Sequence, residues 1–309
     1  MYGRWFNIAI IFLWIVMMTW LVKEKVLPTL LAGSPPDQRT LLETAAADQN
    51  VGWIIRWGQR PIGWAKSHTE KAKDDTIRMT TDVHFDHLPI AGMIPKWLKK
   101  LPGFEKSQEE ILNDGSLETN TTSEMIFSTD GQLQEFHSSV TLVSLDQTIE
   151  LSGKVKGSKV AVRILAENFN YTTEIALNPD LLMSNMLTPQ THLPNLHQGQ
   201  NWMVGVVSPF RYPLGSMEVM YAKVVRHDPC IHNGKQINAW LIEYRKEPNV
   251  DPGDSTPPHC KIWVHPNGMV LRQELHLFDA TLVFEREPAD EVVDLYHGCR
   301  YFVINESDR

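Results

Sequence analysis

The feature that most restricts how this chain can fold is an alternation of apolar and polar residues that begins at Val51. Over Ile77–Phe85, apolar residues and Thr81 occupy every second position, and mostly charged or polar residues lie between them. A period of two is typical of a β-strand with one buried and one exposed face. The same pattern predicts strands over Ser123–Ser128, Leu133–Leu142, Thr148–Lys154, Lys159–Glu167, Phe169–Leu177, Met217–Arg226, Gln236–Tyr244, Lys261–His265, Met269–Phe278 and Leu282–Glu287.

Short turn motifs join many of these predicted strands. Asp130-Gly131, Asn233-Gly234 and Asn267-Gly268 are dipeptides that favour tight hairpin turns. About a dozen strands joined in this way form a meander that has to curl, because a long flat sheet would expose edges that aggregate. We expect residues 49–288 to form a large curved antiparallel sheet, an incomplete barrel. One or two short helices should cover its apolar concave face.

One of these helices is predicted between the strands. Asn178 and Pro179 form a helix start, with Asn as the cap and Pro at the first helical position, and the helix would run to about Met186. A loop over Thr188–Gln200 then leads back into strands.

The amino-terminal segment has a different character. Trp5–Val22 is an uncharged run that would extend about 27 Å as a helix, close to the ~30 Å hydrocarbon thickness of a membrane. We predict a transmembrane anchor over residues 1–25, followed by a partly helical juxtamembrane linker over 26–48. A cleaved signal peptide is the alternative, but Lys23-Glu24-Lys25 follows the run where small residues are needed. Residues 289–309 are assigned to a carboxy-terminal tail.

The balance of charge restricts the partners of the chain. Its 29 Lys and Arg against 37 Asp and Glu give a formal charge of −8. An acidic body lacks the basic surface that binding to a phosphate backbone requires, so we predict no nucleic-acid partner.

The carboxy-terminal half resembles a known family of domains. Gly234–Tyr244, Ile262–Arg272 and Leu282–Arg286 follow one another as in the uncharacterised bacterial envelope domains of lipoprotein-carrier (LolA/LolB-like) architecture, and Gly52-Trp53 with Gly63-Trp64 is similar to their opening hairpin. This resemblance implies a single-pass protein of the bacterial inner membrane with a periplasmic domain. That domain would bind an acyl chain, a lipoprotein or another protein. The resemblance implies no catalytic residue.

Two sets of apolar residues are candidates for a ligand cavity or its lid. The first set is made of tryptophans in predicted strands, which either pack the core or line a cavity for an acyl chain: Trp53, Trp57, Trp64, Trp240 and Trp263. The second set shares one face of a predicted short helix with three lysines opposite, and either caps the sheet or meets a membrane: Ile94, Trp97, Leu98 and Leu101.

The sequence contains two clusters of potential metal ligands, and we predict that neither cluster binds a metal. In the D-V-H-F-D-H motif, Asp82, His84 and Asp86 share the exposed face of a strand, where alternate residues lie ~7 Å apart. Cys230 and Cys260 flank the strand Gln236–Tyr244 at opposite ends, which favours free thiols over a disulfide or a zinc site. We predict no metal and no cofactor.

The leading functional hypothesis is a membrane-anchored, non-catalytic domain that binds an apolar ligand or a protein partner. A structural subunit with a filled interior is the alternative, and a hydrolase that uses Asp or His residues is the third. The first two differ in whether the concave face encloses a cavity of a few hundred Å³.

Overall fold

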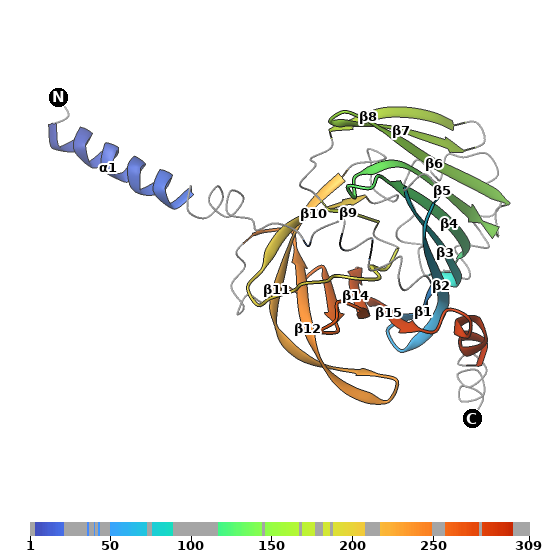
Figure 1. Cartoon of the computed structure of the whole chain (residues 1–309). Coiled ribbons are helices and arrows are strands. Elements are labelled where there is room, and N and C mark those ends of the chain that lie inside the picture. Colours follow the sequence, from blue (N-terminus) through green and yellow to red (C-terminus); the bar gives the residue numbers. More distant parts are fainter. Residues whose placement is uncertain are drawn as a thin grey trace.

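The strands form one continuous sheet of fifteen strands (Figure 1). The computed structural model of the chain describes residues 4–21, 36, 40, 43, 50–72, 76–88, 117–143, 146–166, 169–176, 182–185, 188–207, 217–248, 257–277 and 280–298. The elements are α1 (Arg4–Leu21), β1 (Asn50–Trp57), β2 (Arg60–Lys71), β3 (Ile77–Leu88), β4 (Leu117–Phe127), β5 (Leu133–Leu142), β6 (Gln147–Lys156), β7 (Lys159–Ala166), β8 (Phe169–Ala176), β9 (Leu182–Asn185), β10 (Asn201–Val207), β11 (Met217–His232), β12 (Lys235–Arg245), β13 (Cys260–Val264), β14 (Val270–Leu277) and β15 (Ala280–Glu287).

The predicted antiparallel meander is confirmed, with the first and last strands at its centre. The order across the sheet is β8-β7-β6-β5-β4-β3-β2-β1-β15-β14-β13-β12-β11-β10-β9. Every neighbouring pair is antiparallel except β9 and β10, which are parallel. Two sequential half-sheets, β1–β8 and β9–β15, therefore join through the β1–β15 ladder, in which Ile55 lies opposite Phe284.

The sheet is strongly curved, as predicted. β8 and β9 are consecutive in the sequence but lie at opposite edges of the sheet. The six peptide steps from Ala176 to Leu182 reach at most about 21 Å, so the curvature brings the ends of the two edge strands back toward each other. Figure 1 shows β8 at the top of the molecule and β9 beside β10.

The face that carries Trp53, here called the inner face, holds the main hydrophobic core. This core extends from Val204 on β10 through Ile262 on β13 and Phe284 on β15 to Val83 on β3. The inner face is not apolar throughout, which the alternation alone did not predict. Buried hydroxyls cross β2–β5 in one row, and they pair as Ser67 with Thr81 (3.1 Å) and Ser123 with Ser138 (2.8 Å).

One prediction about the segment between β8 and β11 is wrong. Leu182–Asn185, assigned to a helix, forms β9 and pairs with Val204–Val207 of β10, a strand that the pattern did not reveal. Pairing with β10 here overrides the local helix-start signal. In the part of the chain that the structure describes, extended chain and no helix lies over the concave face near β13–β15. The extended segment 188–200 lies over it, because its backbone bonds to the β13–β14 turn.

Helices are few in the part of the chain that the structure describes. α1 covers the predicted amino-terminal anchor, and residues 292–298 form a second helical segment that the sequence did not predict. No helix among the described residues has both the length and the apolar character needed to cross a membrane, so the transmembrane prediction is not supported. The candidate lid residues Ile94, Trp97, Leu98 and Leu101, and almost all of the linker 26–48, lie outside the described residues.

Candidate functional site

An extended segment, residues 188–200, occupies the inner face where a carrier would hold its ligand; we call it the strap. The backbone N–H of Leu193 donates to the carbonyl of Gly268 (2.7 Å), and the N–H of Val270 donates to the carbonyl of Thr191 (3.0 Å). The side chain of Leu193 is fully buried in the main core. The strap is therefore a packed part of the fold on the inner face beside the β13–β14 turn.

A buried arginine, Arg286 on β15, also holds the strap. The β1–β15 register sets Arg286 opposite Trp53, and its guanidinium lies 5.7 Å from the centre of the indole ring. Nη1 of Arg286 donates to the carbonyl of Thr191 on the strap (3.0 Å) and to that of Val270 on β14 (3.3 Å). Hydrogen bonds from a charged donor are the stronger ones in proteins, so this residue ties the strap to two strands.

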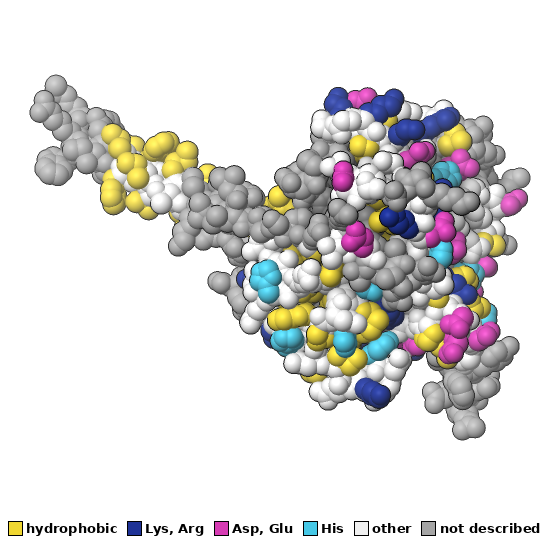
Figure 2. Space-filling view, in the orientation of Figure 1, with side chains coloured by type: hydrophobic (Ala, Val, Ile, Leu, Met, Phe, Trp, Pro, Cys, Tyr) yellow, Lys and Arg dark blue, Asp and Glu magenta, His cyan; other side chains and the backbone are white. Residues whose placement is uncertain are grey.

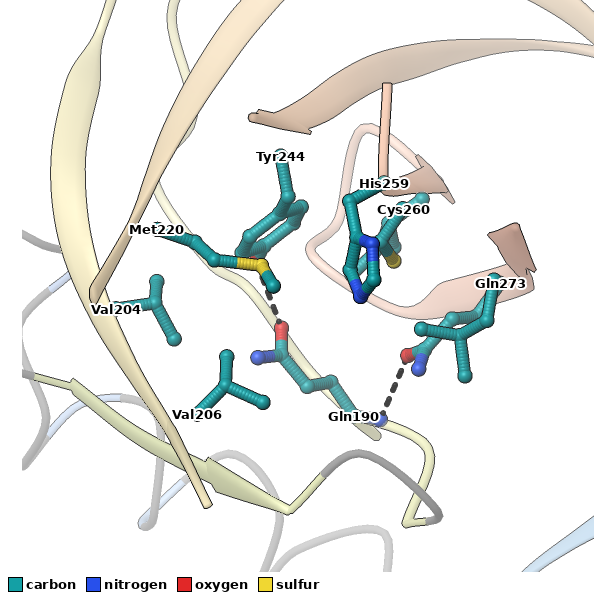
Figure 3. A pocket seen from close by; sticks show the side chains of 10 residues that line it. Gln190, Val204, Val206, Met220, Tyr244, His259, Cys260 and Gln273 are labelled. Atoms are coloured by element: carbon teal, nitrogen blue, oxygen red, sulfur yellow. Dashed lines mark hydrogen bonds between the residues drawn. The ribbon is translucent and has the colours of Figure 1, made fainter. Parts of the chain in front are cut away.

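A small cavity remains between the strap and the strands β10–β14 (Figure 3). The Tyr244 hydroxyl donates to Oε1 of Gln190 (3.2 Å), and the Gln190 backbone N–H donates to Oε1 of Gln273 (3.1 Å). The cavity is lined by Gln190, Val204, Val206, Met220, Tyr244, His259, Cys260, Ile262, Gln273 and Leu275.

The size of this cavity decides what it can hold. Its volume is about 30 Å³, which suits one or two water molecules. Pockets for drug-sized ligands measure about 300–1,000 Å³. An acyl chain does not fit in this cavity.

Two titratable groups on the cavity wall, Cys260 and Tyr244, are held neutral. Burial raises the pKa of the Cys260 thiol far above its usual range, and the nearby Glu274 carboxylate adds to the effect. Burial likewise raises the pKa of the Tyr244 phenol. Because a thiolate or phenolate is the reactive form, neither group is prepared to act as a nucleophile.

The predicted tryptophans divide between the two faces of the sheet. Trp53 is fully buried on the inner face, and Trp57 and Trp240 pack against the same core. Trp64 and Trp263 do not line the interior, which corrects the prediction for these two residues. They occupy positions of the opposite parity, on the outer face, where Trp64 stacks on His84 with a centroid distance of 5.6 Å.

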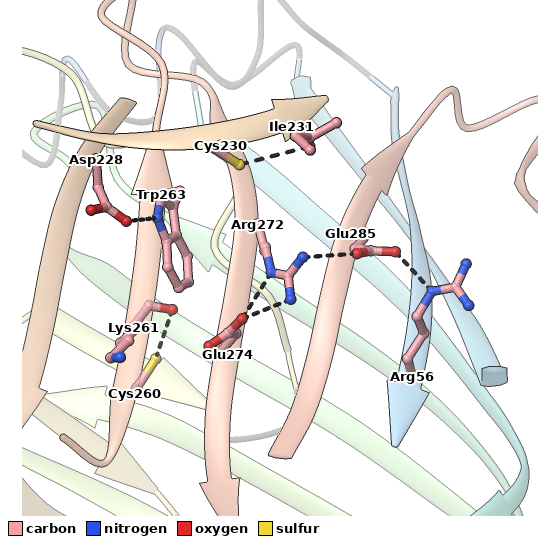
Figure 4. Close-up of polar contacts among 10 residues, drawn as sticks. All are labelled: Arg56, Asp228, Cys230, Ile231, Cys260, Lys261, Trp263, Arg272, Glu274 and Glu285. Carbon is pink, nitrogen blue, oxygen red and sulfur yellow. Dashed lines mark hydrogen bonds and ion pairs between the residues drawn. The ribbon is translucent and has the colours of Figure 1, made fainter. Parts of the chain in front are cut away.

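Charged side chains form a ladder across the outer face of the three strands β1, β15 and β14 (Figure 4). Arg56 on β1 pairs with Glu285 on β15 (2.8 Å), which also accepts from Arg272 on β14 (3.1 Å). Arg272 in turn pairs with Glu274 (2.7 Å) and lies 5.8 Å from the ring centre of Trp263. Each carboxylate is matched by a guanidinium, so the ladder binds neighbouring strands together and exposes no unbalanced charge.

The D-V-H-F-D-H motif is less solvated than predicted. His84 Nε2 lies 2.9 Å from Asp86 Oδ1, and its Nδ1 lies 2.6 Å from Asn120 Oδ1. Tyr296, from the helical segment 292–298, donates to the other oxygen of Asp86. The carboxy-terminal helix thus covers this part of the outer face, which the sequence assigned to solvent.

Cys230 and Cys260 lie far apart, and both are buried free thiols. Cys230 lies opposite Ile237 and Cys260 opposite Tyr244, seven residues further along β12. This separation corresponds to about 23 Å, well beyond the span of a disulfide. Among the described residues, no group of three His, Cys, Asp or Glu side chains could hold a metal ion.

Sequence reasoning missed the strap and Arg286. One signal for Arg286 was present: it follows Leu282 and Phe284 at every second position, so the alternation sets a charged residue on the buried face of β15. A buried arginine needs acceptors, and here two backbone carbonyls supply them.

Comparison with known proteins gives structural neighbours and no family. No family model matches the chain, and no curated protein is similar to it. The chain is similar to a β-barrel-like protein of the domain of unknown function DUF1849 from Brucella abortus, with 9% identity and a TM-score of 0.43 over 77% of this chain and 95% of that one. It is also similar to a DUF1089 family protein from Pseudomonas aeruginosa, with 14% identity and a TM-score of 0.32 over 70% and 90% of the two chains.

Proposed function

We propose that the chain is a non-catalytic β domain that α1 attaches to a membrane, and that it works by binding another protein. The observation that carries the proposal is the exposure of α1. Its large apolar side chains from Ile10 to Leu21 are exposed, from 41% for Met18 to 67% for Phe12 (Figure 2). Contiguous apolar surface of this kind needs a partner that removes it from water.

A membrane is the partner that fits α1 best. No charged residue occurs between Trp5 and Leu21, so the helix is apolar all round. A helix that lies on a membrane surface usually keeps a charged face, whereas α1 has none. We infer that α1 attaches the chain to a membrane by burying its apolar side chains in the bilayer. The bacterial inner membrane with a periplasmic β domain remains our proposal for its location.

The filling of the inner face beside β13–β14, among the residues that the structure describes, favours a protein partner over an apolar ligand at this place. The strap packs Leu193 into the inner face, and the cavity beside it is only about 30 Å³. The acyl-chain carrier suggested by the resemblance to lipoprotein carriers needs a pocket roughly ten times larger.

Flotation of the full chain with lipid vesicles tests the attachment. The wild type should float with vesicles of phosphatidylethanolamine and phosphatidylglycerol. The double variant Leu13→Arg/Val16→Arg should stay at the bottom, because each arginine costs about 2.5–3.5 kcal/mol at the centre of an inserted helix. Leu13→Phe/Val16→Leu is the apolar control and should float. A wild type that does not float would contradict the proposal.

Uptake of a fluorescent fatty acid tests the choice between ligand and protein partner. The full chain in lipid nanodiscs should bind no more of the probe than empty nanodiscs do. Saturable binding above that background would contradict the protein-partner hypothesis if the substitution Val204→Phe, which fills the cavity, weakens it. That result would support the lipid-carrier hypothesis instead.

A further inference from the structure

The strand β8 forms one edge of the sheet and has only one neighbour. It pairs with β7 along its whole length, from Ala166 opposite Phe169 to Lys159 opposite Ala176. Among the strands that the structure describes, none lies on its other side, and Figure 1 shows β8 as the outermost strand at the top of the molecule. Backbone N–H and C=O groups of an edge strand are open to pairing with another chain.

This edge lacks most of the devices with which proteins block such pairing, and its one charged residue is Glu174. β8 reads FNYTTEIA, with no proline, no lysine and no bulge in its register with β7. Most of its residues are strong β-formers. The opposite edge is different, because β9 has only four residues. A regular edge of eight residues is a template for a further strand.

We propose that β8 pairs antiparallel with β8 of a second copy of this chain, around a two-fold axis at Thr172. In an antiparallel pair the residues directly opposite each other lie on the same face. An axis at Thr172 sets this residue opposite its own copy, Tyr171 opposite Thr173, and Asn170 opposite Glu174. The pairing is isologous, as closed dimers require, and it does not depend on α1 or on the membrane.

The chemistry of this register is self-complementary. Thr with Thr and an aromatic residue with a β-branched one are favourable cross-strand pairs. The exposed Asn170 can donate its amide hydrogens to the carboxylate of Glu174, which already accepts from Lys159 at 3.0 Å within one chain. The two acidic residues of the dimer do not face each other. An axis at Thr173 would leave Asn170 opposite Ala176, which offers no side-chain acceptor.

Charge placed on the axis tests the pairing. Thr172→Lys sets two ammonium groups directly opposite each other, and Thr172→Glu sets two carboxylates there. Each change should raise the dimer dissociation constant by about tenfold or more, because like charges opposite each other destabilise a strand pair. An equimolar mixture of the two variants should restore the dimer, since every mixed pair then joins opposite charges.

The measurement is the protein mass of the full chain in detergent micelles by light scattering. The wild type is expected to be a dimer, each variant a monomer with an unchanged circular-dichroism spectrum, and the mixture a dimer. Ser158→Lys and Ser158→Glu introduce the same charges in the exposed β6–β7 turn and should leave the wild-type mass unchanged. A monomeric wild type would overturn the proposal. So would a dimeric Thr172→Lys variant, because dimers formed through α1 or about Thr173 would tolerate that charge.

Discussion

Gly63 on β2 lies so close to β3 that a methyl group at this position would clash with the backbone of β3. A Cβ at this position would lie 2.0 Å from the carbonyl oxygen of His84 and 3.0 Å from the Cα of Phe85 on β3. Backbone atoms in the middle of a sheet cannot move aside cheaply. Gly63→Ala is therefore expected to lower the free energy of unfolding by about 2–3 kcal/mol, measured by urea denaturation.

The control for this substitution is Gly298→Ala. A Cβ there meets nothing within 4 Å, so the free energy of unfolding should change by less than about 0.5 kcal/mol. Equal losses in the two variants would show that the contact with His84 is not the cause.

Cys260 makes stability depend on pH in the alkaline range. Burial raises the pKa of this thiol in the folded protein. Its contribution to stability is therefore fully present below the unfolded pKa of about 8.5 and is lost as the pH rises beyond it. The free energy of unfolding should fall above that pH, by at most about 1.4 kcal/mol per pH unit for this group.

Urea denaturation between about pH 7 and pH 10 checks this dependence against Cys260→Ala. The variant should show a shallower decline. The decline should not vanish, because burial raises the pKa of Cys230 to about 11 and that thiol still titrates. Identical slopes in the two proteins would contradict the assignment.

The sequence predicts the face of the sheet on which a side chain lies when the pattern of its own strand is sufficient. It predicts the face poorly when the pairing register with neighbouring strands determines it. The alternation correctly put Trp53 on the buried face. It did not separate Trp64 and Trp263 from Trp53, because the face of a residue depends on register and bulges that only the partner strands establish. The register of β13 and β14 shifts at a bulge between Trp263 and Val264. Next to this bulge, Leu271 packs with Trp263 on the outer face, whereas Val270 lies in the main core.

At the scale of elements, the docking of the strap on the β13–β14 turn is testable through Gly268. This residue has φ +93°, and a Cβ would lie 2.8 Å from the Cα of Pro194 on the strap. Gly268→Ala should cost about 1–3 kcal/mol and should increase hydrogen exchange at the amides of Leu193 and Val270, which hold the strap.

Gly58→Ala is the matched control, because Gly58 has φ +62° but no atom near its Cβ position. The Gly58→Ala variant has the same kind of backbone strain as Gly268→Ala, but its new methyl group does not clash with the strap. Its unfolding free energy should fall, and the Leu193 amide should keep its protection. Loss of protection in both variants would mean that backbone strain alone loosens the strap.

Elements defined by local signals were predicted closely, and elements defined by distant contacts were not. β5 matches its predicted range, Leu133–Leu142, because alternation and a turn motif both mark it. β9 and the strap depend on pairing with β10 and with the β13–β14 turn, which no local pattern encodes. The helix-start motif at Asn178-Pro179 therefore predicted the wrong element for Leu182–Asn185.

At the scale of the whole molecule, the two half-sheets are continuous segments of the sequence. Among the described residues, β1–β8 and β9–β15 meet mainly through the β1–β15 ladder and the core around it, and Tyr296 after β15 also bonds to Asp86 on β3. A chain divided after residue 178 should therefore reassemble from its two fragments. Co-expression with a tag on one fragment should recover both in equal amounts, with the strand signal of the intact protein in circular dichroism.

A division in the β11–β12 turn, after Asn233, is the control. It separates β11 from β12, whose ladder is long and lies inside one half-sheet. Recovery should be much poorer for this pair of fragments. Equal recovery from both divisions would contradict the existence of two half-sheets as separate folding units.

The central position of β1 also has a consequence for biosynthesis. Arg56 on β1 and its partner Glu285 on β15 are separated by 229 positions in the sequence. At about 5–20 residues per second, a ribosome needs roughly 10–45 seconds to extend the chain from one to the other. Throughout that time the first half-sheet carries an open edge at β1, so the nascent chain has to be shielded by a chaperone or by the translocation machinery until synthesis is almost complete.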